Sequence, residues 1–101
     1  MSLHKLLTED RRLVMLRFLA EDPSYSLNTS LLHDALLLLG HSASRDQVET
    51  DAVWLAEQGL VTVEHVQSVT VARLTPRGLD AAKGLAVIPG VARPGPRHGG
   101  V

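Results

Sequence analysis

The sequence predicts a mainly α-helical domain with a small β-hairpin, and two adjoining stretches carry that prediction. The first is Ser44 to Gly59, where a helix-capping serine precedes apolar residues at helical spacing and a terminating glycine. The second is Leu60 to Leu74, where apolar and polar residues alternate as they do in two short strands. The other segments add helices before and after this pair.

Composition limits the chain to one small domain. It has 101 residues, of which 45% are hydrophobic and only 3% aromatic, so we expect a core of leucine, valine and alanine. A formal net charge of -1 disfavours a general polyanion binder but permits a local basic patch. The sequence contains no cysteine, which excludes a disulfide framework, a thiolate nucleophile and a sulfur-ligated metal.

No stretch of the sequence has the character of a signal peptide or a membrane span. Met1 to Leu16 alternates leucine with charged residues and lacks an uninterrupted apolar core. The leucine-rich run from Leu27 to Leu39 is broken by His33 and Asp34, and it is shorter than the roughly 20 residues that cross a bilayer. We therefore expect a cytoplasmic protein that does not enter a membrane.

The first helix is expected to begin with Thr8 as its cap and to end near Glu21, because a residue that precedes proline avoids helical geometry. A short turn is expected before it, at Leu3 to Leu7. Helical spacing of about 100° per residue gives this helix two apolar faces. The first face holds Leu13, Leu16, Leu19 and Ala20, and the second holds Val14, Met15 and Phe18.

Two interpretations of the second face remain open. The helix is either central and covered on both sides by its own domain, or the face of Val14, Met15 and Phe18 is a homodimer contact, as exposed apolar patches often are.

A helix-turn-helix is predicted in the middle of the chain. Asn28 caps a helix that ends near Leu39, with Gly40 as terminator, and Ser26 and Leu27 before it could form a minimal strand. After a tight turn, Ser44 caps the next helix, which Gly59 ends. Its core face carries Val48, Ala52 and Leu55, and its outer face carries Asp46, Thr50, Val53, Trp54 and Glu57, with Glu49 at the edge.

The hairpin follows directly, as strands 61–66 and 69–74 around a turn at Gln67 and Ser68. Thr75 and Pro76 then begin a fourth helix, which is expected to run through Leu85. Glycine and proline make up half of residues 88–101, which is typical of a flexible tail. The predicted organisation is a domain over residues 1–87 and a tail over 88–101. The register expected for the hairpin turns one set of residues to the core and another outward: Val61, Val63, Ala72 and Leu74 inward, and Thr62, Glu64, Val71 and Arg73 outward.

Two motifs give the chain a resemblance to a known family. SRDQVETDAVWLAEQGLVTV resembles the helix-turn-helix segment of winged-helix transcriptional regulators, and LTPRG is similar to a motif that follows the wing in the MarR, PadR and ArsR groups. The resemblance covers roughly Thr8 to Gly84 and is closest to the small winged-helix proteins of Mu-like prophages. It implies a three-helix core, a two-stranded wing and a C-terminal helix, in a phage or prophage regulator that occupies an operator as a homodimer.

The resemblance also implies a site on double-stranded DNA, with the third helix in the major groove and the wing along the backbone. The residues it assigns to DNA are Ser42, Ser44, Arg45, Asp46, Glu49, Thr50, Gln67, Ser68 and Arg73. The third helix, however, sets Arg45 against Asp46, Glu49, Asp51 and Glu57, and such a helix repels phosphates. Attraction would then come from basic residues elsewhere: Lys5, Arg11, Arg12, Arg77, Lys83, Arg93 and Arg97.

The acidic helix keeps a second function open, in which the domain binds another protein through Trp54, Val53 and the acidic face. Trp54 either packs on the wing or the C-terminal helix, or anchors such an interface, where tryptophan is enriched. Catalytic motifs are absent from the sequence, and its five histidines lack metal-ligand spacing, with His33 and Asp34 the nearest pair. We expect no enzyme activity, no metal and no cofactor.

Overall fold

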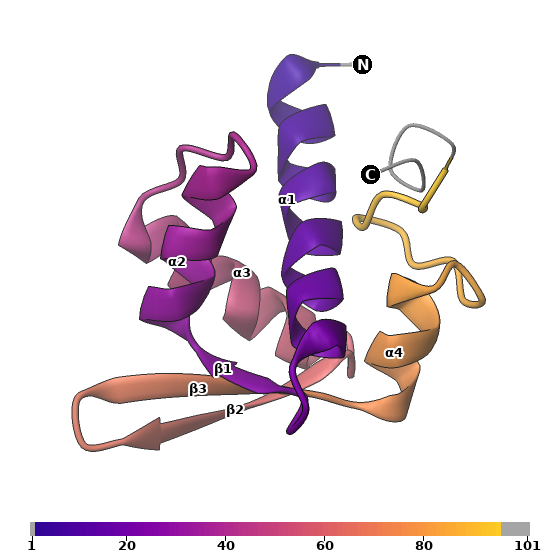
Figure 1. Cartoon of the computed structure of the whole chain (residues 1–101). Coiled ribbons are helices and arrows are strands. Elements are labelled where there is room, and N and C mark those ends of the chain that lie inside the picture. The colour runs from indigo at the N-terminus through magenta and orange to yellow at the C-terminus, as the bar shows by residue number, and fades with distance from the viewer. Residues whose placement is uncertain (1, 96–101) are drawn as a thin grey trace.

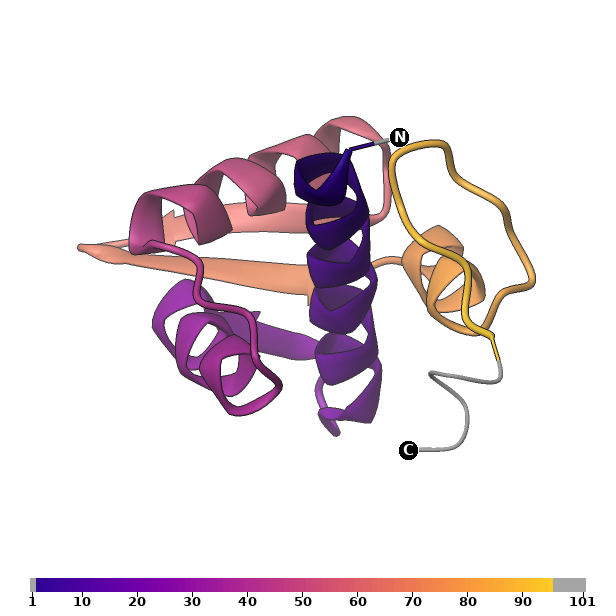
Figure 2. The ribbon, with the colours of Figure 1, turned by 90° about the horizontal axis from the view of Figure 1, so that it is seen from above.

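The computed structural model describes residues 2–95, which form four helices and a three-stranded antiparallel sheet. In Figure 1, α1 stands at the centre, with α2 and α3 on one side and α4 on the other, and Figure 2 shows the same arrangement from above. The strands lie across one end of α1 in the order β1-β3-β2. The elements are α1 (Leu3–Glu21), β1 (Ser26–Asn28), α2 (Thr29–Leu38), α3 (Arg45–Glu57), β2 (Val61–Val66), β3 (Val69–Leu74) and α4 (Pro76–Ala82).

The first helix begins earlier than the sequence indicated. The hydroxyl of Ser2 accepts a hydrogen bond from the backbone N–H of Lys5 at 3.1 Å, so Ser2 is the cap and Thr8 is not. This bond satisfies one of the free N–H groups at the helix start, so α1 begins at Leu3. The segment Leu3 to Leu7, which was expected to be a separate turn, is the first part of α1. The helix ends at Glu21, before Pro23, as predicted.

The three predicted caps of the later helices are confirmed. Asn28 accepts from the N–H of Leu31 at 2.8 Å, Ser44 from Gln47 at 3.1 Å and Thr75 from Gly78 at 3.0 Å. These bonds fix where α2, α3 and α4 begin. The predicted end of α4 at Leu85 was wrong, because the helix stops at Ala82 and Gly84 takes a left-handed φ of 79°.

The hairpin has the predicted register and turn. Val66 pairs with Val69, which leaves Gln67 and Ser68 as the turn, and Gln67 has a φ of 56°. The prediction of a two-stranded sheet was incomplete, because β1 pairs with β3 and sets Leu27 opposite Ala72. β1 is only three residues long, which is too short for a clear alternation in the sequence.

Both apolar faces of α1 are covered by the chain itself. Leu13, Leu16 and Leu19 are fully buried, and so is Met15 on the second face, with 0% of its surface exposed. α1 packs against α2 and β3 and, on the other side, against α4. Val14 is also buried and Phe18 is half-buried. This fits the interpretation in which the helix is central and covered on both sides by its own domain, and it leaves Val14 and Met15 unavailable for a homodimer contact.

The segment after α4 packs against the domain. We call residues 88–95 the C-terminal strap. Ile88 and Val91 are buried in the core, and the N–H of Ala92 donates to the backbone carbonyl of Glu9 in α1 at 3.1 Å. The prediction of a flexible tail was therefore wrong for this part, while its remainder, residues 96–101 with Arg97, lies outside the described residues.

Candidate nucleic-acid interface

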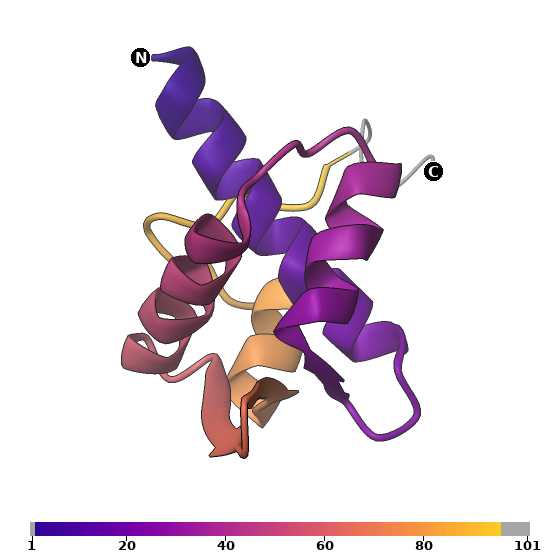
Figure 3. The ribbon, with the colours of Figure 1, turned by 90° about the vertical axis from the view of Figure 1, so that its left-hand side faces the viewer.

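α2 and α3 lie side by side in front of α1, joined by a turn that crosses it, with the hairpin beneath them (Figure 3). α3 buries one side of its surface, formed by Val48, Asp51, Ala52 and Leu55. The opposite side of its first half leaves Arg45, Asp46 and Thr50 exposed. The helix thus presents polar side chains outward while its apolar side chains fix its position.

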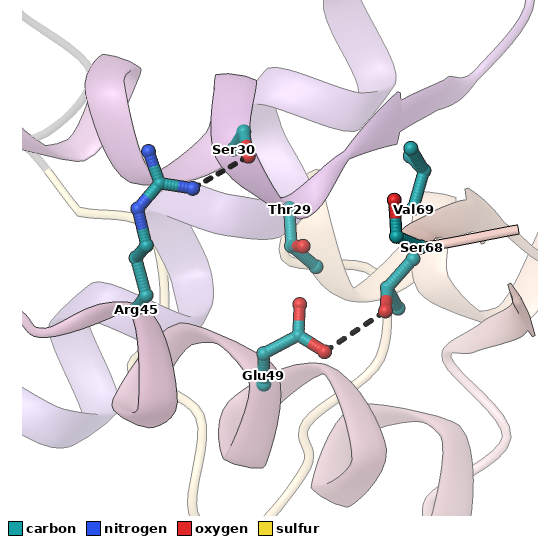
Figure 4. Close-up of a pocket in the computed structure, with 7 residues that line it drawn as sticks. Thr29, Ser30, Arg45, Glu49, Ser68 and Val69 are labelled. Atoms are coloured by element: carbon teal, nitrogen blue, oxygen red, sulfur yellow. Dashed lines mark hydrogen bonds between the residues drawn. The ribbon is translucent and has the colours of Figure 1, made fainter.

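A groove of about 240 Å³ runs between the start of α2, the first half of α3 and the turn of the hairpin (Figure 4). Three elements distant in sequence meet here because β1 leads directly into α2 and pairs with β3. The lining residues are Thr29, Ser30, Arg45, Glu49, Ser68, Val69 and Thr70.

Hydrogen bonds tie the walls of this groove together. The Arg45 guanidinium donates through Nη1 to the hydroxyl of Ser30 at 2.7 Å. The hydroxyl of Thr70 on β3 donates to the Glu49 carboxylate at 2.9 Å, and Thr70 also lies 3.1 Å from Nδ1 of His65. Glu49 therefore joins α3 to the hairpin.

The groove brings together three of the nine residues assigned to DNA from the sequence: Arg45, Glu49 and Ser68. Asp46 and Thr50 are exposed on α3 and Gln67 lies in the adjoining turn, whereas the Ser44 hydroxyl is engaged as the helix cap.

Two of the assigned residues lie away from the groove. Ser42 lines a different hollow, beside His41 and the start of α1. Arg73 is on the outward face of the sheet and donates to the backbone carbonyl of Ser24 at 3.3 Å.

Asp51 does not belong to the acidic outer face. The residue is 2% exposed, and its carboxylate accepts from Nε of Arg11 at 2.6 Å and from Nε of Arg12 at 3.1 Å. A buried carboxylate needs such partners, because leaving a charge unpaired in the interior is costly. Three acidic side chains, not four, therefore remain against Arg45 on the outside of α3, and Arg11 is buried and withdrawn from solvent.

Sequence reasoning missed two features of the site. Thr29 and Ser30 at the start of α2 supply hydroxyls to the groove, and the cap residue Asn28 next to them was the available signal. The inward position of Asp51 was also readable, because Asp51 lies three residues after the buried Val48 and therefore near the same side of a helix.

Trp54 was assigned to a protein interface and is half-buried within the chain. The Arg12 guanidinium lies 3.9 Å from the centroid of its ring, and Gly90 of the C-terminal strap packs against the ring edge. Its packing partners thus include α1 and the strap.

The histidines of the described residues are dispersed or paired with single carboxylates. Among residues 2–95, no group of three histidine, aspartate or glutamate side chains is placed to hold a metal ion. His33 pairs with Asp34 at 3.2 Å, and His41 lies 2.8 Å from the carboxylate of Asp10. None of the helices over the same residues has the length and apolar character required to span a membrane.

The fold and groove define a small domain in which a pair of helices and a β-hairpin share one polar face. The chain belongs to the family of the "Uncharacterized protein gp26" of Escherichia phage Mu. It is 50% identical to that protein over 95 residues, which cover 94% of this chain and 98% of the phage protein. The predicted relationship to proteins of Mu-like phages is thereby confirmed.

A second relative, an "Uncharacterized protein" of Haemophilus influenzae, is 48% identical over 80 residues, or 78% of each chain. No family model and no solved structure matches the chain.

Proposed function

We propose that this chain is a winged-helix protein that binds double-stranded DNA and regulates transcription by occupying its site. In this proposal α2 and α3 are the helix-turn-helix and β2–β3 is the wing. The observation that carries it is the polar groove, where the exposed first half of α3 and the hairpin turn face the same opening. The resemblance of the helix-turn-helix segment to winged-helix regulators supports the same function.

The groove offers specific chemistry for a duplex. An arginine at the start of a recognition helix donates two hydrogen bonds to guanine or pairs with a phosphate. Arg45 is in that position, and its present acceptor, the Ser30 hydroxyl, is an exposed group that a DNA acceptor replaces. Asp46 is exposed beside it and suits the amino group of cytosine, which carboxylates accept from.

Charge limits the strength of this interaction. The outer side of α3 still carries Asp46, Glu49 and Glu57, and these repel phosphates. Asp51 adds little to that repulsion, because its carboxylate is paired with Arg11 and Arg12 in the interior. We therefore expect binding that depends on few phosphate contacts and on the base contacts of Arg45.

The test is the affinity of the full chain for duplex DNA, measured by fluorescence anisotropy on a mixed-sequence library and on sites selected from it. Arg45→Ala should weaken binding to a selected site by roughly tenfold or more, which corresponds to the ~1–3 kcal/mol of an arginine-guanine contact. Lys83→Ala is the matched control. Lys83 was one of the basic residues expected to attract DNA, but it lies at the end of α4, on the opposite side of α1 from α2 and α3. Its replacement removes the same charge and should leave the affinity unchanged. Equal losses of affinity in both variants would show that Arg45 contributes only its positive charge and makes no specific base contact.

A second candidate function is binding of another protein by the outer side of α3. The observation that favours it is a shallow groove next to the first, where Val53 is 48% exposed beside Trp54 and between Glu49 and Glu57. An apolar floor with acidic edges fits a segment that carries an aliphatic side chain and flanking lysine or arginine. Val53→Asn removes the apolar floor without adding a charge to α3, so it should abolish such a complex and leave DNA binding through Arg45 intact; a complex that survives this change would contradict the second function.

Homodimerisation stays a prediction. Val14 and Met15 are buried within the chain, so the DNA-binding proposal does not depend on a dimer contact at these residues.

A further inference from the structure

The C-terminal strap connects α4 to the helix that faces DNA in the proposed function. It crosses α1, where Ile88 and Val91 enter the core and Ala92 bonds to the carbonyl of Glu9. Figure 2 shows the chain leaving α4 and returning along α1 on the side away from α2. The strap is thus held at three points along a short stretch.

Arg12 of α1 is the link between the strap and α3. Its Nη1 donates to the backbone carbonyl of Gly90 at 3.0 Å, and its Nε donates to the Asp51 carboxylate at 3.1 Å. The same guanidinium lies over the Trp54 ring. One side chain therefore contacts the strap and two residues of α3, and its position depends on all three contacts.

Gly90 is required for the strap to seat. It has a left-handed φ of 94°, and a Cβ added there would lie 2.7 Å from two carbons of the Trp54 ring and 3.3 Å from Nη1 of Arg12. A separation of 2.7 Å is well inside van der Waals contact. Any other residue at this position displaces either the ring or the strap, and the ring is held between the strap and Arg12.

We propose that the C-terminal strap is a conformational latch for α3. When the strap is seated, the Gly90 carbonyl fixes Arg12, which in turn fixes Asp51 and Trp54 and so the orientation of α3 against α1. When the strap is lifted, Trp54 becomes exposed, and α3 keeps its buried apolar contacts but loses the restraint that Arg12 places on Asp51 and Trp54. The seated state is the one that presents Arg45 correctly, so lifting the strap weakens DNA binding; this last step rests on the proposed function.

The latch is tested in the full-length chain with Gly90→Ala and two matched glycine controls. Gly40→Ala places a side chain at a similar left-handed φ of 87° with no atom within 4 Å, and Gly95→Ala adds a side chain with no atom within 4 Å. Trp54 is the single tryptophan of the sequence, so its fluorescence reports on the strap directly. Gly90→Ala should shift the emission to longer wavelength and increase quenching by acrylamide, and neither control should do so.

Two further measurements test whether displacing the strap changes α3 and its binding to DNA. Hydrogen-deuterium exchange of the α3 amides should become faster in Gly90→Ala than in either control, because the helix loses its tether to the strap. The affinity for DNA should fall several-fold in the same variant. Arg12→Lys provides a second route: it keeps a positive charge beside Asp51 but loses the fork that also reaches Gly90, and it should give the same three changes.

The outcomes separate the latch from the DNA-binding proposal. If the wild-type chain binds no DNA, the proposed function fails. The Trp54 fluorescence and the hydrogen exchange of the α3 amides still test whether the strap restrains α3. The latch is overturned if the Trp54 fluorescence is unchanged in both Gly90→Ala and Arg12→Lys. It is also overturned if the fluorescence changes but the hydrogen exchange of the α3 amides does not. If the wild type binds DNA and both variants bind equally well despite a lifted strap, the regulatory step is wrong. Circular dichroism checks that helix content is retained in every variant compared.

Discussion

Replacing Asp51 with asparagine should lower the free energy of unfolding by about 3–5 kcal/mol, the range found when one partner of a buried ion pair is removed. Asp51 is 2% exposed and is shared by Arg11 and Arg12. Asparagine has nearly the same volume, so the loss comes from charge and not from a cavity. The two guanidinium groups would face each other without the carboxylate that now lies between them, and that is the physical source of the loss.

The measurement is equilibrium unfolding in urea, with Asp46→Asn as the control. Asp46 is an exposed acid in the first turn of the same helix, so its replacement should change stability by at most about 0.5–1 kcal/mol. A loss below about 1 kcal/mol for Asp51→Asn would mean that the ion pairs contribute little. The assignment of Asp51 to the interior network, and with it the reduced acidity of the outer face, would then need revision.

Gly78→Ala should destabilise the domain by about 3 kcal/mol or more, at the upper end of the cost of overpacking. In most helices the same change is favourable by about 1 kcal/mol, because alanine has the higher helix propensity. Here a Cβ at Gly78 would lie 2.0 Å from the backbone oxygen of Leu60 and 2.7 Å from a methyl group of Leu74. The Leu60 carbonyl accepts from Thr75 at the entrance to α4, so the backbone cannot move aside without losing that bond.

The thermal unfolding midpoint of Gly78→Ala, compared with that of Gly95→Ala, checks this expectation. Gly95 has no atom within 4 Å of an added Cβ, and the control should unfold close to the wild type. A stabilised Gly78→Ala variant would show that helix propensity outweighs the contact with Leu60, and that α4 lies further from Leu60 than it does in this structure.

Local signals in the sequence predicted the helices and the hairpin well. Asn28, Ser44 and Thr75 were recognised as caps because a cap acts on N–H groups only two or three residues away. The hairpin register followed from alternation and a short turn. β1 was predicted only as a possible two-residue strand, since its pairing with β3 is a contact between segments far apart in sequence.

Errors arose where a residue's partner is distant in the chain. Asp51 was counted among the acids of the third helix that repel phosphates, yet its partners Arg11 and Arg12 lie about forty positions away in α1. The strap was read as flexible from its glycine and proline content. At position 90 a side chain would collide with Trp54, so the glycine there serves close packing. Composition alone does not distinguish a glycine that allows close packing from one in a flexible segment.

The candidate site was predictable in outline. Arg45, Glu49 and Ser68 were assigned through the resemblance to winged-helix regulators, and they do line one groove. The hydroxyls of Thr29 and Ser30 were not assigned, because the position of the α2 start beside α3 depends on the crossing of two helices. Arg73 was placed near DNA, but the sheet turns it toward the Ser24 carbonyl.

The salt dependence of duplex DNA binding by the wild-type chain tests the central claim most directly. Each phosphate contact contributes a slope of about -0.9 to a plot of log affinity against log salt concentration for B-form DNA. We predict measurable binding at low salt with a shallow negative slope, equivalent to only a few phosphate contacts, because α3 offers Arg45 against three exposed or half-buried acids. Binding that is undetectable at low salt, or that does not weaken as salt rises, would contradict the assignment of this face to DNA.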